Sequence, residues 1–253
     1  MRINPKPYFE AVLELTPPAQ KVETPQLEVN GDDRYYAVTS QAFIPGVRRL
    51  RKLALQEDRE EIWGALPSQQ KWIELGIRAQ PIVIEKNGEN LNVQVSIALD
   101  EDRLETLIHQ HDDLIVIHIH PAETTRQITK FSGAKPYHYY LEASALPSGA
   151  DLVAMAKYSR GKILLFAIVS ELGLTTFKMT PQGVNTEASE FIYSLYVEAA
   201  LQRAQESDGL SSLERVRKAC ALLNSVGNFT VKFIPFVFKK RSLLSRDGEN
   251  LRG

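Results

Sequence analysis

The sequence predicts a mixed α/β fold in which a mixed sheet is flanked by helices and followed by a C-terminal helical extension. First, the chain has 253 residues, enough to bury a full core in one domain with additions. Second, residues 113–120, "DLIVIHIH", form an apolar run of strand length between two helical patterns. Third, two consecutive helical patterns occupy much of the last third.

The first part of the chain predicts an arm, a strand and an amphipathic helix. Residues 1–34 are rich in proline and polar groups, which indicates an extended N-terminal arm. Residues 34–39, "RYYAVT", alternate enough to form a strand. Apolar side chains at helical spacing, with basic residues on the other face, predict a helix over 46–61.

A hairpin and a helix follow. Residues 81–85 and 91–99 predict two strands, and Asn87-Gly88 between them tolerates the positive φ of a tight turn. Residues 100–111, "DEDRLETLIHQH", open with acidic residues and then show apolar helical spacing, as the first turns of a helix should.

The remaining elements are predicted from caps and periodicity. Ser148 is a good N-cap for a helix that follows it, and the Ser211-x-x-Glu214 capping box opens another. The expected elements are a helix from 148, strands at 162–170 and 174–180, helices at 186–206 and 211–227, and a last apolar stretch at 229–238.

Composition excludes several classes of protein. Lys+Arg 30 against Asp+Glu 31 gives a net charge of -1, so a nucleic acid is not an expected partner, and a small molecule or a protein fits better. The single cysteine, Cys220, cannot form an internal disulfide, which favours a reducing, cytoplasmic setting. The start lacks the apolar region of a signal peptide and no run reaches transmembrane length, so we expect a soluble protein without a membrane partner.

His118 and His120 are candidate metal ligands. On a strand these two side chains point to one face, while the neighbouring isoleucines point to the other. Zinc in a catalytic site takes three protein ligands and a water, so a third ligand is required. The simpler interpretation is two polar residues that end a strand, and the pair alone does not decide between them.

Two further motifs carry chemistry. Asp151 follows Ser148 in "PSGADL", where the carboxylate can reach a metal and the hydroxyl can assist an oxyanion, although an N-cap with an acidic first turn explains both. Glu61 in "EEIWGAL" is a candidate general base, although it is also one more acid in a charged cluster. Glu60 is its main rival, but only Glu61 has a glycine three residues later.

Together, Glu61-x-x-Gly64, His118-x-His120-Pro121 and Ser148-x-x-Asp151 resemble the JAMM (MPN-plus, JAB-type) family of zinc metalloproteases. The resemblance covers residues 35–179 and includes the order of the elements. It implies a cytidine-deaminase-like MPN fold. By the same resemblance, the two histidines and the aspartate bind Zn²⁺, Glu61 is the acid/base, and Ser148 helps to hold the oxyanion.

The resemblance implies a deubiquitinase-like isopeptidase. Such a hydrolase cleaves a peptide or isopeptide bond, in a ubiquitin-like conjugate or precursor, by attack of a zinc-activated water on the carbonyl. One alternative is a non-catalytic MPN-type scaffold, although such members usually lack the ligands. A second is hydrolysis of a small amide, since zinc with a glutamate base is a general tool.

The resemblance divides the chain into an arm at 1–34, a metalloprotease-like domain at 35–180 and a helical extension at 181–253. Residues 122–147 depart from the family pattern, in which a short loop joins the proline to the serine. We interpret them as an insertion, either a structural elaboration or a flap bordering the cleft, and expect the fold and zinc binding not to need them. His138 lies within this insertion, and His109 and His111 are expected at the surface.

Overall fold

The structure is a computed structural model that describes residues 44–56, 60–78, 82–86, 89–93, 97–132, 135–162, 164–185 and 189–236. Three predicted features lie outside these residues: the N-terminal arm, the strand at 34–39 and the Asn87-Gly88 turn. The end of the predicted extension, from residue 237, also lies outside them.

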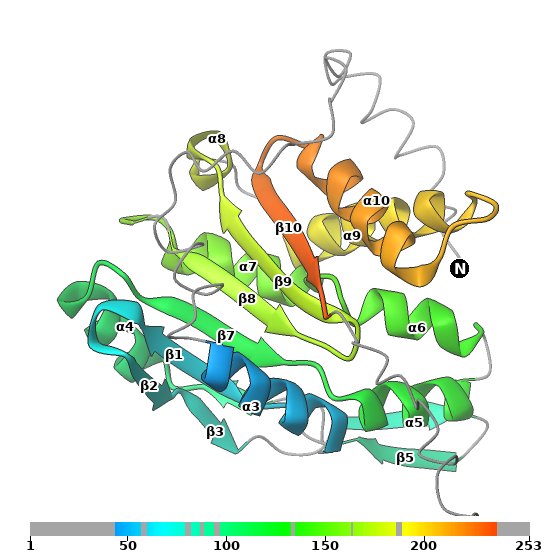
Figure 1. The fold of residues 1–253 in the computed structure, drawn as a ribbon, viewed down its shortest axis with the longest axis horizontal. Helices are drawn as coiled ribbons and strands as arrows, with labels where there is room; N and C mark the ends of the chain where they lie inside the picture. Colours follow the sequence, from blue (N-terminus) through cyan, green and yellow to red (C-terminus); the bar gives the residue numbers. More distant parts are fainter. Residues whose placement is uncertain are drawn as a thin grey trace, which may run out of the picture.

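A six-stranded mixed sheet forms the centre of the molecule, in the order β10-β9-β8-β7-β1-β2 (Figure 1). β7 and β8 are parallel, and the other neighbours are antiparallel. The bounds are β1 Ile62–Leu66, β2 Lys71–Glu74, β7 Ile115–Ile119, β8 Leu165–Val169, β9 Gly173–Met179 and β10 Phe229–Pro235. The predicted α/β class, with a mixed sheet flanked by helices, is confirmed.

Two small antiparallel pairs lie beside this sheet. β3 (Gly76–Arg78) pairs with β6 (Ile97–Leu99), and β4 (Ile82–Lys86) pairs with β5 (Glu89–Val93). The second pair agrees with the predicted antiparallel strands, but the single strand predicted over 91–99 corresponds to two strands, β5 and β6, with different partners. The helices are α3 Ile44–Gln56, η1 Pro67–Gln69, α4 Glu101–Gln110, α5 Ala122–Ser132, α6 Tyr137–Ala143, α7 Gly149–Tyr158, α8 Pro181–Val184, α9 Glu190–Gln205 and α10 Ser212–Asn224.

Helices cover both faces of the sheet because the inner strands are apolar on both faces. Ile115, Ile117 and Ile119 of β7 pack in one hydrophobic cluster with residues of α3. Val116 belongs to the cluster on the other face, which includes residues of α4, α7, α9 and α10. Figure 1 shows α3 lying across β1 and β7. Each fully buried aliphatic side chain contributes about 1.5–3 kcal/mol, so the two clusters hold the layers together.

The helix starts follow the predicted caps. Asp100 accepts a bond from the Arg103 amide at the start of α4. Ser148 and Ser211 each form a complete capping box, the first with Asp151 and the second with Glu214. These bonds satisfy amide groups that have no partner within the helix, which explains why α7 and α10 begin where the sequence predicts.

The segment at 122–147 contains α5 and α6, and its C-terminal end packs into the domain. Ala145, Leu146 and the carboxylate-bearing Glu142 are buried at its C-terminal end. Thr175 of β9 donates a hydrogen bond to the carbonyl of Ala145. Its last residues therefore belong to the core, and the expectation that the fold does not need the segment stays a prediction.

The region from 181 onward also shares this core. β10 pairs with β9 along seven residue positions, and α9 and α10 contribute buried residues to the same cluster as β7 and β8. The predicted helices α9 and α10 are present, and they share the hydrophobic cluster of β7 and β8. In the part of the chain that the structure describes, none of the helices has the length and apolar character needed to cross a membrane.

Candidate metal centre

His118 and His120 lie at the carboxyl end of β7, which is where ligands collect in sheets with parallel strands. His118 is the next-to-last residue of the strand and is 8% exposed, whereas His120 follows the strand and is half-buried. Their Nε2 atoms are 3.0 Å apart. The alternation of side chains therefore brings the two imidazoles together, as predicted.

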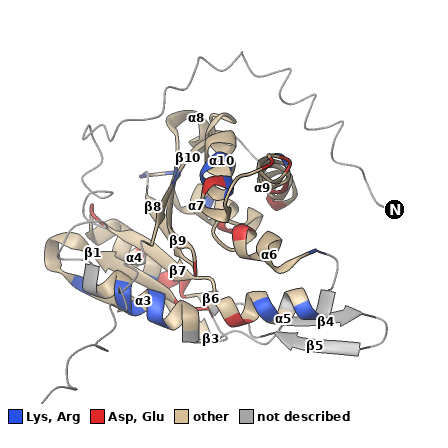
Figure 2. Ribbon diagram, turned by 45° about the vertical axis from the view of Figure 1, so that its right-hand side comes forward, with Lys and Arg blue, Asp and Glu red and all other residues tan. Residues whose placement is uncertain are grey.

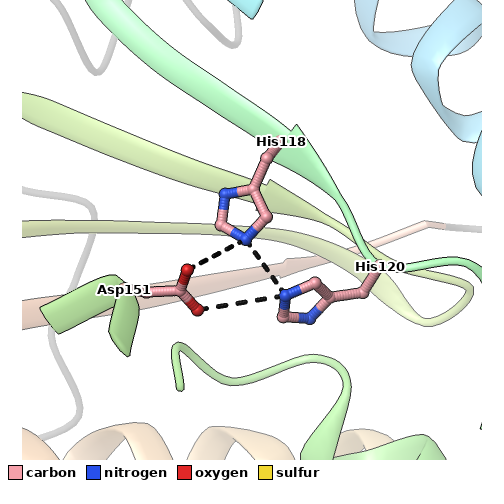
Figure 3. Close-up of side chains that lie close together, drawn as sticks. All are labelled: His118, His120 and Asp151. Atoms are coloured by element: carbon pink, nitrogen blue, oxygen red, sulfur yellow. Dashed lines mark hydrogen bonds and ion pairs between the residues drawn. The ribbon is translucent and has the colours of Figure 1, made fainter. Parts of the chain in front are cut away.

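Asp151 reaches the histidines from the first turn of α7 (Figure 3). Its Oδ1 lies 3.3 Å from Nε2 of His118, and its Oδ2 lies 3.9 Å from Nε2 of His120. Oδ2 also accepts hydrogen bonds from the amide and the hydroxyl of Ser148, both at 2.7 Å. The capping box thus fixes one carboxylate oxygen and leaves the other directed at His118.

The donor atoms are separated by 3.0, 3.3 and 3.9 Å, values on either side of those expected for ligands of one metal ion. Ligand atoms that lie 2.0–2.2 Å from a tetrahedral zinc are roughly 3.3–3.6 Å from one another. The three donors of His118, His120 and Asp151 lie within 4.8 Å of one another and form a group that could hold a metal ion. Two neutral imidazole nitrogens and one carboxylate oxygen are also a donor set typical of catalytic zinc, which leaves one position for a solvent molecule.

The electrostatics favour a neutral His118 next to an ionised Asp151. Burial lowers the pKa of His118 to about 4, and the neighbouring His120 adds to this, although Asp151 opposes it. Burial raises the pKa of Asp151, but the two histidines and the Ser148 bonds outweigh it, so the pKa lies below its ordinary value. A neutral imidazole and a carboxylate are the states that bind a metal.

A main-chain carbonyl orients His120. Its Nδ1 lies 2.7 Å from the carbonyl oxygen of Ser144, at the C-terminal end of α6. A carbonyl oxygen only accepts hydrogen bonds, so Nδ1 carries the proton and Nε2 keeps its lone pair. Histidines that bind a metal through one ring nitrogen commonly donate the N–H of the other to a carbonyl in this way. The sequence did not predict Ser144, because nothing in it shows where the end of α6 lies.

The sheet places Glu60, rather than Glu61, on the face of the two histidines. Ile62 pairs with His118 across β1 and β7, and Glu60, two residues earlier, points to the same side. The pKa of Glu60 is raised to about 9, mainly by burial and to a lesser extent by the nearby carboxylate of Asp151. A bound cation would favour its ionised form again.

Glu61 points to the opposite side of β1. Its Oε2 accepts a hydrogen bond, 2.9 Å long, from the indole Nε1 of Trp63, and the guanidinium of Arg49 on α3 lies 5.2 Å from that ring. The carboxylate of Glu61 therefore contacts Trp63 on the α3 face of the sheet, and its role as acid/base stays a prediction. Motif spacing pointed to Glu61, whereas strand alternation counted back from His118 points to Glu60.

Gly64, the residue that favoured Glu61 in the sequence, has a packing role. A Cβ at this position would lie 3.2 Å from side-chain atoms of both Leu114 and Leu75. The tight core beside β1 is a sufficient reason for glycine there.

The other histidines lie away from this group. His109 is exposed in the last turn of α4, and His138 is exposed on α6. Nδ1 of His111 lies 3.3 Å from Nε2 of Gln69. The expectation that His109 is a surface residue is confirmed.

Comparison of the chain with protein-family models, with curated proteins and with solved structures finds no match. The resemblance to the JAMM family therefore depends on the three motifs and on the geometry of the residues that they contain.

Proposed function

We propose that the protein is a zinc-dependent hydrolase that cleaves a peptide or isopeptide bond. The observation that carries this proposal is the convergence of His118 Nε2, His120 Nε2 and an Asp151 oxygen at one point, with Glu60 on the same side of the sheet. A zinc ion held by these ligands supplies a Lewis acid that polarises a carbonyl and lowers the pKa of a water. The donor set, not a family match, supports zinc over harder cations.

In this proposal Glu60 is the general base and acid. Its carboxylate takes a proton from the attacking water as the new carbon–oxygen bond forms at the carbonyl carbon. It then delivers this proton to the nitrogen of the leaving amine, and the carbon–nitrogen bond breaks. Its burial and its place beside the ligands suit this task. We assign Glu61 instead to holding Trp63 on the α3 side of the sheet.

Ser148 acts on Asp151 in this proposal. Its hydroxyl donates to Asp151 Oδ2 and accepts from the Asp151 amide at 3.1 Å, so its only donor is already used. We therefore assign it to orienting the ligand, whereas the sequence suggested contact with an oxyanion.

The resemblance to JAMM proteases supports a substrate such as a ubiquitin-like conjugate or precursor. Cys220 is free and buried, in keeping with the cytoplasm as the expected setting.

The test is hydrolysis by purified protein, first treated with a chelator and then supplied with zinc. Substrates are a panel of isopeptide-linked ubiquitin-like conjugates and unstructured peptides of matched sequence. We expect cleavage only with zinc, and much slower cleavage by Glu60→Gln loaded with zinc. Zinc binding without cleavage of any substrate would favour the non-catalytic scaffold, and cleavage of small amides alone would favour the third alternative.

A further inference from the structure

We propose that Glu142, on α6, is a positioning residue for the metal centre. Its hydrogen bonds to α9 and α10 hold in place the carbonyl of Ser144, which orients His120. This inference rests on the metal site proposed above. It assigns to the C-terminal helices a role in the chemistry of His120, beyond their part in the core.

The carboxylate of Glu142 is completely buried and joins three helices. Its Oε1 accepts hydrogen bonds from the Ser212 hydroxyl at 2.7 Å and from Nε of Arg215 at 2.9 Å, both on α10. Its Oε2 accepts a bond of 3.0 Å from Nε2 of Gln205 at the end of α9. A buried carboxylate needs such partners, so the three donors fix where the C-terminal turn of α6 can lie.

The same turn carries the carbonyl that orients His120. The carbonyl of Glu142 accepts from the amide of Ser144 and, at 3.2 Å, from that of Ala145. These bonds set the direction of the Ser144 carbonyl, which lies 2.7 Å from His120 Nδ1. A displacement of Glu142 therefore moves the Ser144 carbonyl, which keeps the proton of His120 on Nδ1. The proton can then move to Nε2, and the lone pair of Nε2 is no longer available for a metal.

The second flank of the site lies against one of these two helices, α9. Gly149, the first residue of α7, lies so close to α9 that a Cβ there would be 2.6 Å from the carbonyl oxygen of Glu190. Residues 144–151 thus run from Ser144, whose carbonyl contacts His120, to Asp151. Helix α9 lies against this segment near Gly149 and bonds through Gln205 to Glu142, just before its start.

The test compares Glu142→Gln with Val216→Ala. Val216 is completely buried on α10, next to Arg215, so its truncation loosens the same helix without removing a hydrogen bond of Glu142. The first readout is the ¹⁵N chemical shift of the two His120 nitrogens in metal-free protein, above the titration range of imidazole, which reports the tautomer directly. The second is zinc affinity.

In the wild type and in Val216→Ala we expect His120 to be protonated on Nδ1. In Glu142→Gln we expect a mixture of tautomers and a loss of zinc affinity of about tenfold, the lower end of the effect of outer-shell partners. Ser212→Ala, which removes one donor only, should shift both readouts in the same direction by less, and it decides the matter if Glu142→Gln does not fold.

An unchanged tautomer and affinity in the folded Glu142→Gln protein, or in Ser212→Ala if the former does not fold, would overturn the proposal. Equal changes of tautomer and zinc affinity in Val216→Ala would also overturn it, because they would show that the effect comes from a loss of stability and not from the hydrogen bonds of Glu142. The tautomer is measured without metal or substrate, so a wild type that binds no zinc refutes the proposed function while this readout still tests Glu142.

Discussion

Oδ1 of Asp151 lies 3.3 Å from Nε2 of His118, although Asp151 lies in the first turn of helix α7 and His118 is the next-to-last residue of strand β7. The second oxygen of the same carboxylate completes the capping box of Ser148. One side chain therefore caps the helix and is also a candidate metal ligand, so the two interpretations that the sequence offered as alternatives are compatible.

Asp151→Asn is expected to abolish zinc binding, because the amide removes the charge that compensates the cation. Ser148→Ala is the matched variant: it keeps the ligand but removes the cap, which costs about 0.5–2 kcal/mol of stability. Isothermal titration with zinc and thermal unfolding of both proteins provide the measurement. Equal zinc affinity in Asp151→Asn and wild type would show that Asp151 only caps the helix.

Glu60→Gln is expected to keep zinc and to lower kcat by about 10²- to 10⁴-fold, the usual contribution of a general base. Glu61→Gln, one residue away, is expected to keep most of the activity because its carboxylate faces Trp63. Kinetics with a cleavable conjugate, together with metal content, distinguish the two. The reverse pattern would mean that the spacing to Gly64, and not the alternation of β1, identifies the base.

Replacement of 122–146 by a short Gly/Ser loop is expected to lose zinc and to destabilise the fold. It removes the Ser144 carbonyl from His120 and takes Ala145 and Leu146 out of the core. Zinc content and the thermal midpoint of the shortened protein are the readouts. A stable variant with wild-type zinc affinity would restore the interpretation of this segment as a dispensable flap.

Gly149→Ala is expected to cost about 1–3 kcal/mol and to weaken zinc binding, since overpacking pushes α9 away from the first turn of α7. Gly161→Ala is the control, because a Cβ there meets nothing within 4 Å. It should change stability by less than about 0.5 kcal/mol. Chemical denaturation of both variants measures the difference, and similar values would contradict the close approach of the helices.

The thiol of Cys220 provides an independent check of the C-terminal core. Burial raises its pKa to about 12, so it stays protonated at neutral and mildly alkaline pH. A thiol reagent should leave the native protein unmodified and react fully after unfolding. Rapid modification of the native protein would mean that α10 does not pack as described.

Local signals in the sequence predicted much of the fold. Caps at Ser148 and Ser211 marked where α7 and α10 begin, an acidic start marked α4, and the apolar run before His118 marked the central strand. These features depend on neighbours in sequence, so periodicity and cap chemistry are sufficient to find them.

Features that depend on contacts distant in sequence were not predicted. The buried ion pair of Glu142 with Arg215 joins residues that look like ordinary surface charges in their own helices. The choice between Glu60 and Glu61 depends on the pairing of Ile62 with His118, which only the sheet reveals. The three metal-ligand candidates were predicted because each motif has a characteristic spacing, and the structure brings their donor atoms together.

The most direct test of the central claim is elemental analysis of the purified wild type beside His120→Ala. We expect about one zinc ion per wild-type chain, on the rule of three protein ligands and one solvent position, and little or none in the variant. A wild type without zinc after zinc loading, or equal zinc in the two proteins, would contradict the assignment of His118, His120 and Asp151 as a metal centre.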